Sequence, residues 1–217
     1  MNMRGTLACC LLAVVVAGAA FGQSANVPVR PTLTYTEGQV TIDGKDASIG
    51  DAVPLGATIV TAAQSVAEIE FSGLNIIQLG EGTTFIFNPN NLQLGSELKK
   101  GTLALVLKKI ATVSGGPAFT VRTPSAVCGV RGTTFFVNAL DPSTTYVCSC
   151  NGDVHVEDLS GGSVHDMVAA HHKAYLFTTT ASGATVTDST LLYHSDESMD
   201  ALAAKIGVKI DWTTPDG

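Results

Sequence analysis

Two cysteines stand two residues apart in the stretch Tyr146–Asp153, which reads YVCSCNGD. On a β-strand, residues i and i+2 leave the same face about 6.5 Å apart along the backbone, so Cys148 and Cys150 are predicted to point the same way. Their parallel Cβ vectors disfavour a disulfide between them. Two thiolates directed at one point suit a soft or borderline metal ion, and zinc binds thiolate at about 2.3 Å and imidazole at about 2.0 Å. The spacing therefore predicts a site for zinc or iron on this strand.

A histidine pair further along the chain could complete such a site. His171 and His172 stand together in the stretch AAHHKAYLF. One or both imidazoles could join Cys148 and Cys150 as metal ligands. Two other histidines are expected to be surface or strand residues, namely His155 and His165.

Cys128 is the third candidate ligand among the cysteines. A turn over Asp141–Thr144 would place Cys148 opposite about Val137, and on a straight ladder Cys128 would then lie on the order of 20 Å away. Cys128 can join the metal site only if the chain folds back at the corner Gly129–Gly132.

Three other uses of these cysteines remain open. In an oxidising compartment, Cys128 could form a disulfide with Cys148 or Cys150. The thiols could also be inert, because buried free cysteines behave as small hydrophobic residues. A cysteine nucleophile would need a nearby base, for which His171 is the candidate.

The sequence contains no established catalytic motif. It has no G-x-S-x-G elbow, no H-E-x-x-H helix, no P-loop and no dinucleotide-binding fingerprint. Glu68 and Glu70 could pair for acid–base chemistry, but the alternating strand around them indicates the solvated side of a sheet. The formal net charge of −7 offers no electrostatic footprint for nucleic acid. We therefore predict a non-enzymatic protein without a nucleic-acid partner.

The N-terminus has the pattern of a secretory signal peptide. Arg4 precedes the apolar run Leu7–Ala20, and small residues follow up to a cleavage point near Gly22–Gln23. The run of about 14 apolar residues is shorter than the ~20 that a membrane-spanning helix needs. We expect residues 1–22 to be removed on export, which leaves a periplasmic or secreted chain without a membrane span.

Short alternating runs separated by glycine dominate the chain from Thr32 to about Phe177. Such runs of β-branched and aromatic residues are typical of an all-β sandwich, barrel or solenoid. Gly101 and Gly152 are expected between strands, where a positive φ or a tight bend is needed. The expected strands are 58–61, 66–71, 76–79, 84–87, 103–107, 118–122, 133–138 and 144–148.

The last part of the chain has a different pattern. Ser195 can cap a helix that begins at Asp196 and ends at Gly207. Val208–Trp212 is expected to add an edge strand after it. Met199, Leu202, Ala203 and Ile206 share one face of this helix. The C-terminal extension could dock on the β domain or present a surface to a partner, and we expect it to dock.

The stretch Phe119–Val137 carries the most specific pattern in the chain, and it reads FTVRTPSAVCGVRGTTFFV. Pro124 cannot donate to a strand ladder, so we interpret this stretch as a β corner. Together with Leu55-Gly56, Lys100–Leu103 and Gly152–Val154, it resembles the signature of the FecR domain family. These are bacterial envelope domains named after the iron-dicitrate transport regulator, and the resemblance covers roughly residues 37–177.

The resemblance implies a β-solenoid-like or sandwich-like periplasmic domain that acts in protein–protein signalling or as an envelope binding module. The expected organisation is a signal peptide over 1–22, a lead-in over 23–36, a FecR-like β domain over 37–180 and an extension with a short helix over 181–217. We expect a stand-alone exported, non-enzymatic module whose partner is another envelope protein, with a metal or redox site at the cysteines. A metal or redox sensor and a cysteine-dependent enzyme are the alternatives.

Overall fold

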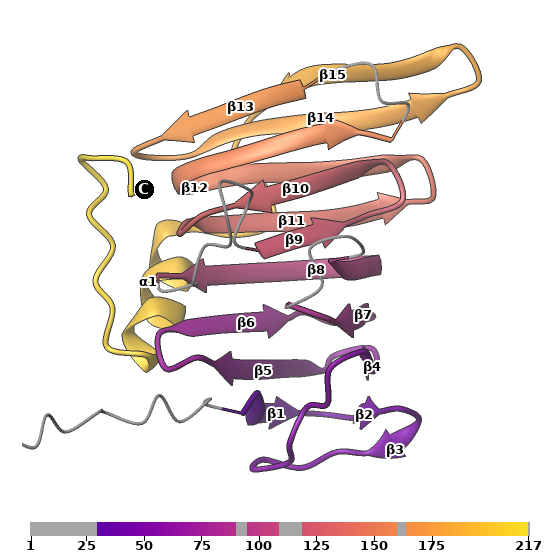
Figure 1. Cartoon of the computed structure of the whole chain (residues 1–217), viewed down its shortest axis with the longest axis vertical. Coiled ribbons are helices and arrows are strands. Elements are labelled where there is room, and N and C mark those ends of the chain that lie inside the picture. The colour runs from indigo at the N-terminus through magenta and orange to yellow at the C-terminus, as the bar shows by residue number, and fades with distance from the viewer. Residues whose placement is uncertain (1–29, 90–94, 109–118, 160–163, 217) are drawn as a thin grey trace, which may run out of the picture.

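The computed structural model describes residues 30–89, 95–108, 119–159 and 164–216. Within these ranges, fifteen strands form a continuous hydrogen-bonded network that is folded into two layers (Figure 1). The all-β prediction is confirmed. The predicted signal peptide, residues 1–22, lies outside the described residues, and no described helix is long and apolar enough to cross a membrane.

The first layer, called layer A, contains eight strands that are all paired antiparallel. In spatial order they are β1 (Thr32–Glu37), β5 (Val66–Phe71), β6 (Asn75–Leu79), β8 (Ser96–Leu107), β11 (Thr134–Asp141), β12 (Thr144–Asp158), β14 (Lys173–Thr180) and β15 (Gly183–Ser189).

The second layer, called layer B, includes the other parts of β8 and β12. In spatial order its strands are β3 (Lys45–Asp46), β2 (Val40–Ile42), β4 (Ala57–Thr61), β7 (Thr84–Phe87), β8, β9 (Phe119–Arg122), β10 (Ala126–Val130), β12 and β13 (Val164–Ala169). Its pairs are antiparallel except β8 with β9, which is parallel.

Two long strands pass from one layer to the other. In β8, Lys100 pairs with β7 of layer B, whereas Gly101 pairs with β11 of layer A. In β12, Asn151 pairs with β11 of layer A, whereas Gly152 pairs with β13 of layer B. Both glycines have positive φ, +87° and +118°, which allows the strand to bend sharply without ending. The prediction that they separate strands was therefore wrong, although the predicted positive φ is present.

The main core lies between the two layers, where each strand places alternate side chains. It contains five fully buried phenylalanines, namely Phe85, Phe87, Phe119, Phe135 and Phe177. The strands also extend beyond the expected domain limits of 37–180, because β1 begins at Thr32 and β15 ends at Ser189. Both outer strands pair with neighbours in layer A, so they belong to the same body.

The stretch Thr123–Val137 is a β corner, as predicted. Thr123 and Ser125 form the turn between β9 and β10, and their hydroxyl groups contact the Thr145 hydroxyl at 2.8 and 2.7 Å. Gly132, with φ +147°, then lies between β10 of layer B and β11 of layer A. The motif therefore turns the chain from one layer to the other.

The helix α1 (Asp196–Lys205) covers the outer face of layer A over β6 and β8. Ser195 caps it, with a reciprocal bond to Ser198, and Gly207 follows its end with φ +69°. Its buried side chains are Met199, Leu202 and Ala203, which face a second apolar cluster on the sheet. The predicted helix and its docking are both present.

The predicted edge strand Val208–Trp212 is not a strand. Figure 1 shows this segment running across the ends of the strands, so it cannot enter a ladder with them. Its Ile210 side chain is buried beside α1, and the Asn151 side-chain amide donates to the Asp211 carbonyl at 2.8 Å. The segment Val208–Trp212 is thus held by side-chain packing and by the Asn151 hydrogen bond, and not by pairing with a strand.

An ion pair between the exposed Lys205 and the buried Glu68 fixes the C-terminal end of α1. The Lys205 ammonium lies 2.7 Å from both carboxylate oxygens of Glu68, and the Gln78 amide donates to the same carboxylate at 2.8 Å. The expectation that Glu68 lies on a solvated face was wrong, because α1 covers that face and leaves the Glu68 side chain 2% exposed. Glu70 is half-buried.

Candidate metal centre

Cys148 and Cys150 lie on β12 and face α1 from the outer side of layer A. Their sulfur atoms are 4.0 Å apart, and both residues are fully buried. The shared face follows from the two-residue period of the strand. Cys148 pairs in register with Phe136 of β11, one residue from the expected Val137.

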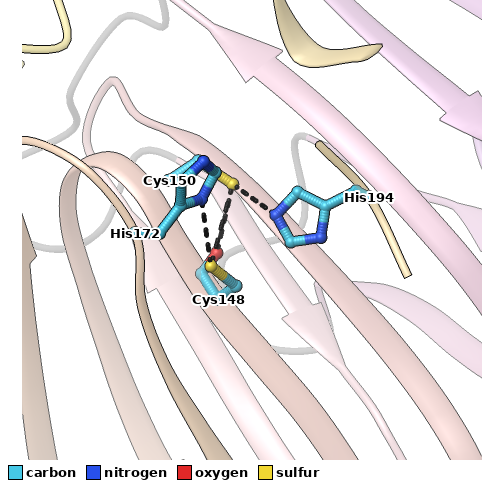
Figure 2. A group of neighbouring side chains, drawn as sticks. All are labelled: Cys148, Cys150, His172 and His194. Atoms are coloured by element: carbon cyan, nitrogen blue, oxygen red, sulfur yellow. Dashed lines mark hydrogen bonds between the residues drawn. The ribbon is translucent and has the colours of Figure 1, made fainter. Parts of the chain in front are cut away.

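Two imidazoles approach the sulfur atoms from different parts of the chain (Figure 2). His172 lies in the turn before β14, and its Nδ1 is 3.5 Å from the Cys148 Sγ. His194 lies just before α1, and its Nε2 is 3.2 Å from the Cys150 Sγ. The four donor atoms all lie within 4.8 Å of one another.

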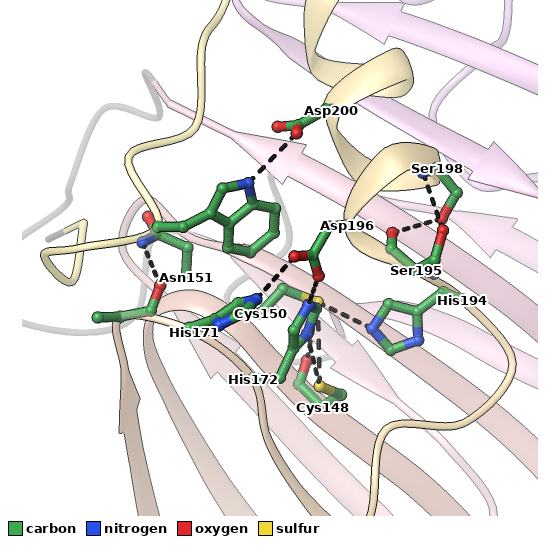
Figure 3. A network of polar contacts seen from close by, with 12 residues as sticks. Cys148, Cys150, Asn151, His171, His172, His194, Ser195, Asp196, Ser198 and Asp200 are labelled. Atoms are coloured by element: carbon green, nitrogen blue, oxygen red, sulfur yellow. Dashed lines mark hydrogen bonds and ion pairs between the residues drawn. The ribbon is translucent and has the colours of Figure 1, made fainter.

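The second nitrogen of each imidazole has a partner of its own, and Figure 3 shows the one between His172 and Asp196. The His172 Nε2 lies 2.7 Å from the Asp196 carboxylate, and the His194 Nδ1 lies 2.8 Å from the Leu192 carbonyl. A carbonyl can only accept, so the His194 Nδ1 donates to Leu192, and this bond holds the ring with its Nε2 facing Cys150. Such outer bonds fix the ring and tautomer of metal-binding histidines.

Three of the distances between the donor atoms are close to the edges of a tetrahedral zinc site. Bonds of about 2.3 Å to sulfur and about 2.0 Å to nitrogen place two sulfurs about 3.8 Å apart and a sulfur and a nitrogen about 3.5 Å apart. The Sγ–Sγ distance is 4.0 Å, and the two Sγ–N distances are 3.5 and 3.2 Å. These side chains could therefore hold a four-coordinate ion with little movement.

The two thiols titrate as a coupled pair. The hydrogen bond from Cys150, followed by those from His172 and His194, lowers the pKa of Cys148 to about 4 against the opposing effect of burial. Burial, and next the hydrogen bond to Cys148, raises the pKa of Cys150 well above its usual range. Burial alone would lower the pKa of His172, but its bonds to Cys148 and Asp196 raise it. At neutral pH the pair therefore holds one proton, as one thiolate and one thiol. A metal ion that binds both sulfur atoms would displace this proton.

His171 occupies an outer position instead of a ligand position. Its Nε2 lies 2.8 Å from the second oxygen of Asp196, and it belongs with His172 and Asp196 to a second, more exposed group of donors. The Trp212 ring lies against both histidines, with ring centroids 5.1 Å apart in each case, and its Nε1 donates to Asp200 at 3.3 Å. We expected one or both of these histidines at the cysteines, and the structure places only His172 there.

Cys128 does not approach the other cysteines. It lies on β10, between Val121 of β9 and Val156 of β12, and its side chain is buried in the core between the layers. The corner at Gly129–Gly132 leads the chain onward to layer A, so Cys128 is on the inner side of the sandwich. Among the described residues all three cysteines are free, and the considered disulfide from Cys128 is absent.

The burial of Cys128 predicts an unreactive thiol. Burial raises its pKa from 9.0 to about 12, so iodoacetamide should leave Cys128 unmodified in the native protein and modify it in urea. The folded state keeps the proton while the unfolded state loses it, so the free energy of unfolding should fall as pH rises from 9 towards about 12. Mass spectrometry and urea titrations against pH measure both effects. Rapid native labelling of Cys128, or an alkaline slope as steep in Cys128→Ala as in the wild type, would contradict this assignment.

His155 and His165 lie away from the centre, as expected. The His155 Nδ1 lies 2.6 Å from Asp166 of β13, and the His165 ring packs beside Phe177. The residue that the sequence did not reveal is His194. Its only sequence signal is its position immediately before Ser195, the N-cap of the helix that covers the cysteines.

Residues 57–155 match the family model described as FecR protein. This stretch of the chain is thus similar to the FecR family. The matched range includes Cys148 and Cys150, whereas the other members of the centre, His172, His194 and Asp196, lie beyond it. The centre thus connects the matched range with the segment that follows it.

Two crystal structures resemble the chain, both titled "putative anti-sigma factor" from Parabacteroides distasonis. Each is 19% identical, with a TM-score of 0.47, over 60% of this chain and 59% of the other. The chain therefore matches about three fifths of the length of these structures. No curated protein matches it.

Proposed function

We propose that this protein is an exported, non-enzymatic module of the bacterial envelope that binds another protein in signalling and carries one metal ion at Cys148, Cys150, His172 and His194. Zinc is the preferred ion and iron the alternative. The similarity to the FecR family supports the signalling role. The observation that carries the metal role is the set of four donor atoms within 4.8 Å of one another, three of whose separations are close to the edges of a tetrahedral zinc site.

The chemistry of the donors favours zinc in a structural role. Two thiolates and two imidazoles are a common set for structural zinc sites, which are closed and four-coordinate. Catalytic zinc sites keep one position open for water or substrate, whereas here all four corners have a protein donor. Iron is compatible with thiolate and imidazole as well, but zinc needs no redox partner.

A cysteine-dependent enzyme has weaker support. Cys148, His172 and Asp196 do form a chain of contacts at 3.5 and 2.7 Å, which is the order of a nucleophile, a base and an orienting carboxylate. However, Cys148 is 0% exposed, so a substrate could not reach its sulfur. An enzymatic role would require turnover that iodoacetamide abolishes.

In an exported protein, a bound metal ion would also protect the two cysteines from oxidation. The pattern over residues 1–22 supports secretion into an oxidising compartment, where free thiols are at risk of oxidation. A metal ion would keep Cys148 and Cys150 as thiolates and protect them. Zinc occupancy is thus the state that we propose for the exported chain.

Metal analysis of the purified, tag-free exported protein tests the metal role. We expect about one zinc ion per chain, and Co²⁺ substitution should give the visible bands of tetrahedral cobalt together with sulfur-to-cobalt charge transfer. A stoichiometry far below one both as purified and after reconstitution would remove the metal from the proposal.

Binding measurements on envelope extracts test the signalling role. A partner that binds the purified chain specifically and saturably would support it. Failure of every captured envelope protein to bind saturably, with the zinc-loaded chain correctly folded, would leave the metal site without the proposed partner function.

A further inference from the structure

The four donor atoms of the centre come from two separate parts of the chain. Cys148, Cys150 and His172 belong to β12 and to the turn before β14, which are parts of the sheet body. His194 belongs to the C-terminal segment, defined here as Leu191–Thr214, and lies 44 residues from Cys150 in sequence. An ion bound by all four donors would cross-link this segment to the sheet.

The same segment also supplies the group that orients a ligand from the sheet. Asp196, the first residue of α1, binds the Nε2 atoms of both His172 and His171. Movement of the segment would thus remove one ligand, His194, and release the orienting carboxylate of a second. Metal binding therefore depends on the position of the segment through two of its residues, the ligand His194 and the orienting Asp196.

The backbone is strained at two points next to the centre. His172 has φ +42° and Tyr193, the residue before His194, has φ +68°. Left-handed backbone costs free energy in residues with a bulky side chain, and such strain persists only where other contacts hold it. An ion bound to His172 and His194 would supply that holding contact.

Contacts with Tyr146 hold the N-terminal side of the segment, because its hydroxyl donates to the Thr190 carbonyl at 3.2 Å and its ring lies 5.2 Å from the Tyr193 ring. Leu191, Leu192 and Tyr193 are largely exposed, and their neighbourhood is tied to the sheet through the Tyr146 hydroxyl, which contacts the Leu192 amide at 3.1 Å. The His194 ring itself stacks on Phe136, with the ring centroids 4.4 Å apart. The opposite end of α1 has an independent attachment in the ion pair between Lys205 and Glu68.

The segment covers an apolar strip on the outer face of layer A. The strip consists of Ile76 on β6, Val106 on β8 and Phe136 on β11, three strands that are neighbours in the sheet. Met199 and Leu202 of α1 pack on it and are buried. Release of the segment would therefore expose a contiguous apolar strip on adjacent strands.

Resting on the metal site proposed above, we propose that the bound ion acts as a clasp that holds the C-terminal segment closed over this strip. When the ion leaves, the segment opens from its His194 end, while the Lys205–Glu68 pair and the bonds from the Asn151 amide to the Asp211 and Thr214 carbonyls keep its C-terminal side attached. The module then presents the strip formed by Ile76, Val106 and Phe136. The metal site in this way regulates which surface the module offers.

Hydrogen–deuterium exchange of the full mature chain, zinc-loaded and chelator-stripped, tests the clasp. Amides in Leu191–Ala203 should exchange at least about tenfold faster without zinc, because their hydrogen bonds would open locally. Amides of β11 should keep their protection, since the sheet core does not depend on the ion. His194→Ala should show the fast exchange even with zinc bound through the other three ligands, whereas His165→Ala, remote from the centre, should behave as wild type.

The other outcomes separate this proposal from the metal site itself. If one zinc ion binds but α1 exchanges equally with and without it, the clasp is wrong and the metal site stands. If stripping exposes β11 as well as α1, the ion supports the whole fold and the local clasp is again wrong. If no zinc binds, both proposals are overturned.

Discussion

Replacing Cys148 by serine should lower the affinity for zinc by at least about 100-fold, a loss larger than the 10–100-fold typical of outer-sphere substitutions. The substitution removes one of two thiolates, and the serine hydroxyl does not ionise in the neutral pH range to replace it. Competition with a chromophoric chelator measures the affinity. Cys150→Ser should have a similar effect, because its sulfur occupies another of the four corners.

Two matched variants distinguish ligands from neighbours. Cys128→Ser changes a cysteine in the core between the layers, so zinc affinity should stay within about twofold of wild type once the variant is folded. Asp196→Asn should lose about 10–100-fold, because Asp196 orients His172 without binding the ion. Equal affinities for Cys148→Ser and Cys128→Ser would exclude Cys148 as a ligand.

Protons should leave the protein when the metal binds. The raised pKa of Cys150 means that this thiol is protonated at neutral pH, and a zinc ligand must be a thiolate. Zinc affinity should therefore increase with pH through the neutral range. Titration calorimetry in buffers with different ionisation enthalpies counts the released protons, and a count of zero would argue against coordination by Cys150.

The paired cysteines were predictable from the sequence because the geometry that joins them is local. Cys148 and Cys150 share a face on any regular strand. The choice between His171 and His172 was not predictable, because the φ of +42° at His172 decides which ring turns inward. His194 was beyond sequence reasoning, because its contact with Cys150 depends on how α1 packs across the sheet.

The strands also fall into a group that could be predicted from local sequence and a group that could not. Short alternating runs such as Val66–Phe71 were located to the residue. The long strands β8 and β12 were not recognised as continuous, because a glycine with positive φ usually marks a turn. Whether such a glycine ends a strand or bends it depends on neighbours that pair on both sides, which is tertiary information.

Replacing Gly101 by alanine should destabilise the protein by about 3 kcal/mol or more. Gly101 has φ +87°, which is unfavourable for residues with a side chain. An added Cβ would also lie 2.6 Å from the Thr83 Cα, and backbone atoms cannot move aside as the end of a flexible side chain can. Because Gly101 is the point where β8 passes from layer B to layer A, relief of the clash would disturb both layers.

Gly44→Ala is the matched control, since Gly44 has a similar φ of +75° but nothing within 4 Å of an added Cβ. This variant should lose only the backbone term, about 1–2 kcal/mol. Urea unfolding of the zinc-loaded variants measures both values, and the midpoint should fall without a change in slope. Equal losses in the two variants would mean that the close approach of Thr83 does not matter. In that case the crossing of β8 would depend on the φ of residue 101 alone, and asparagine, which tolerates left-handed backbone, should replace Gly101 at little cost.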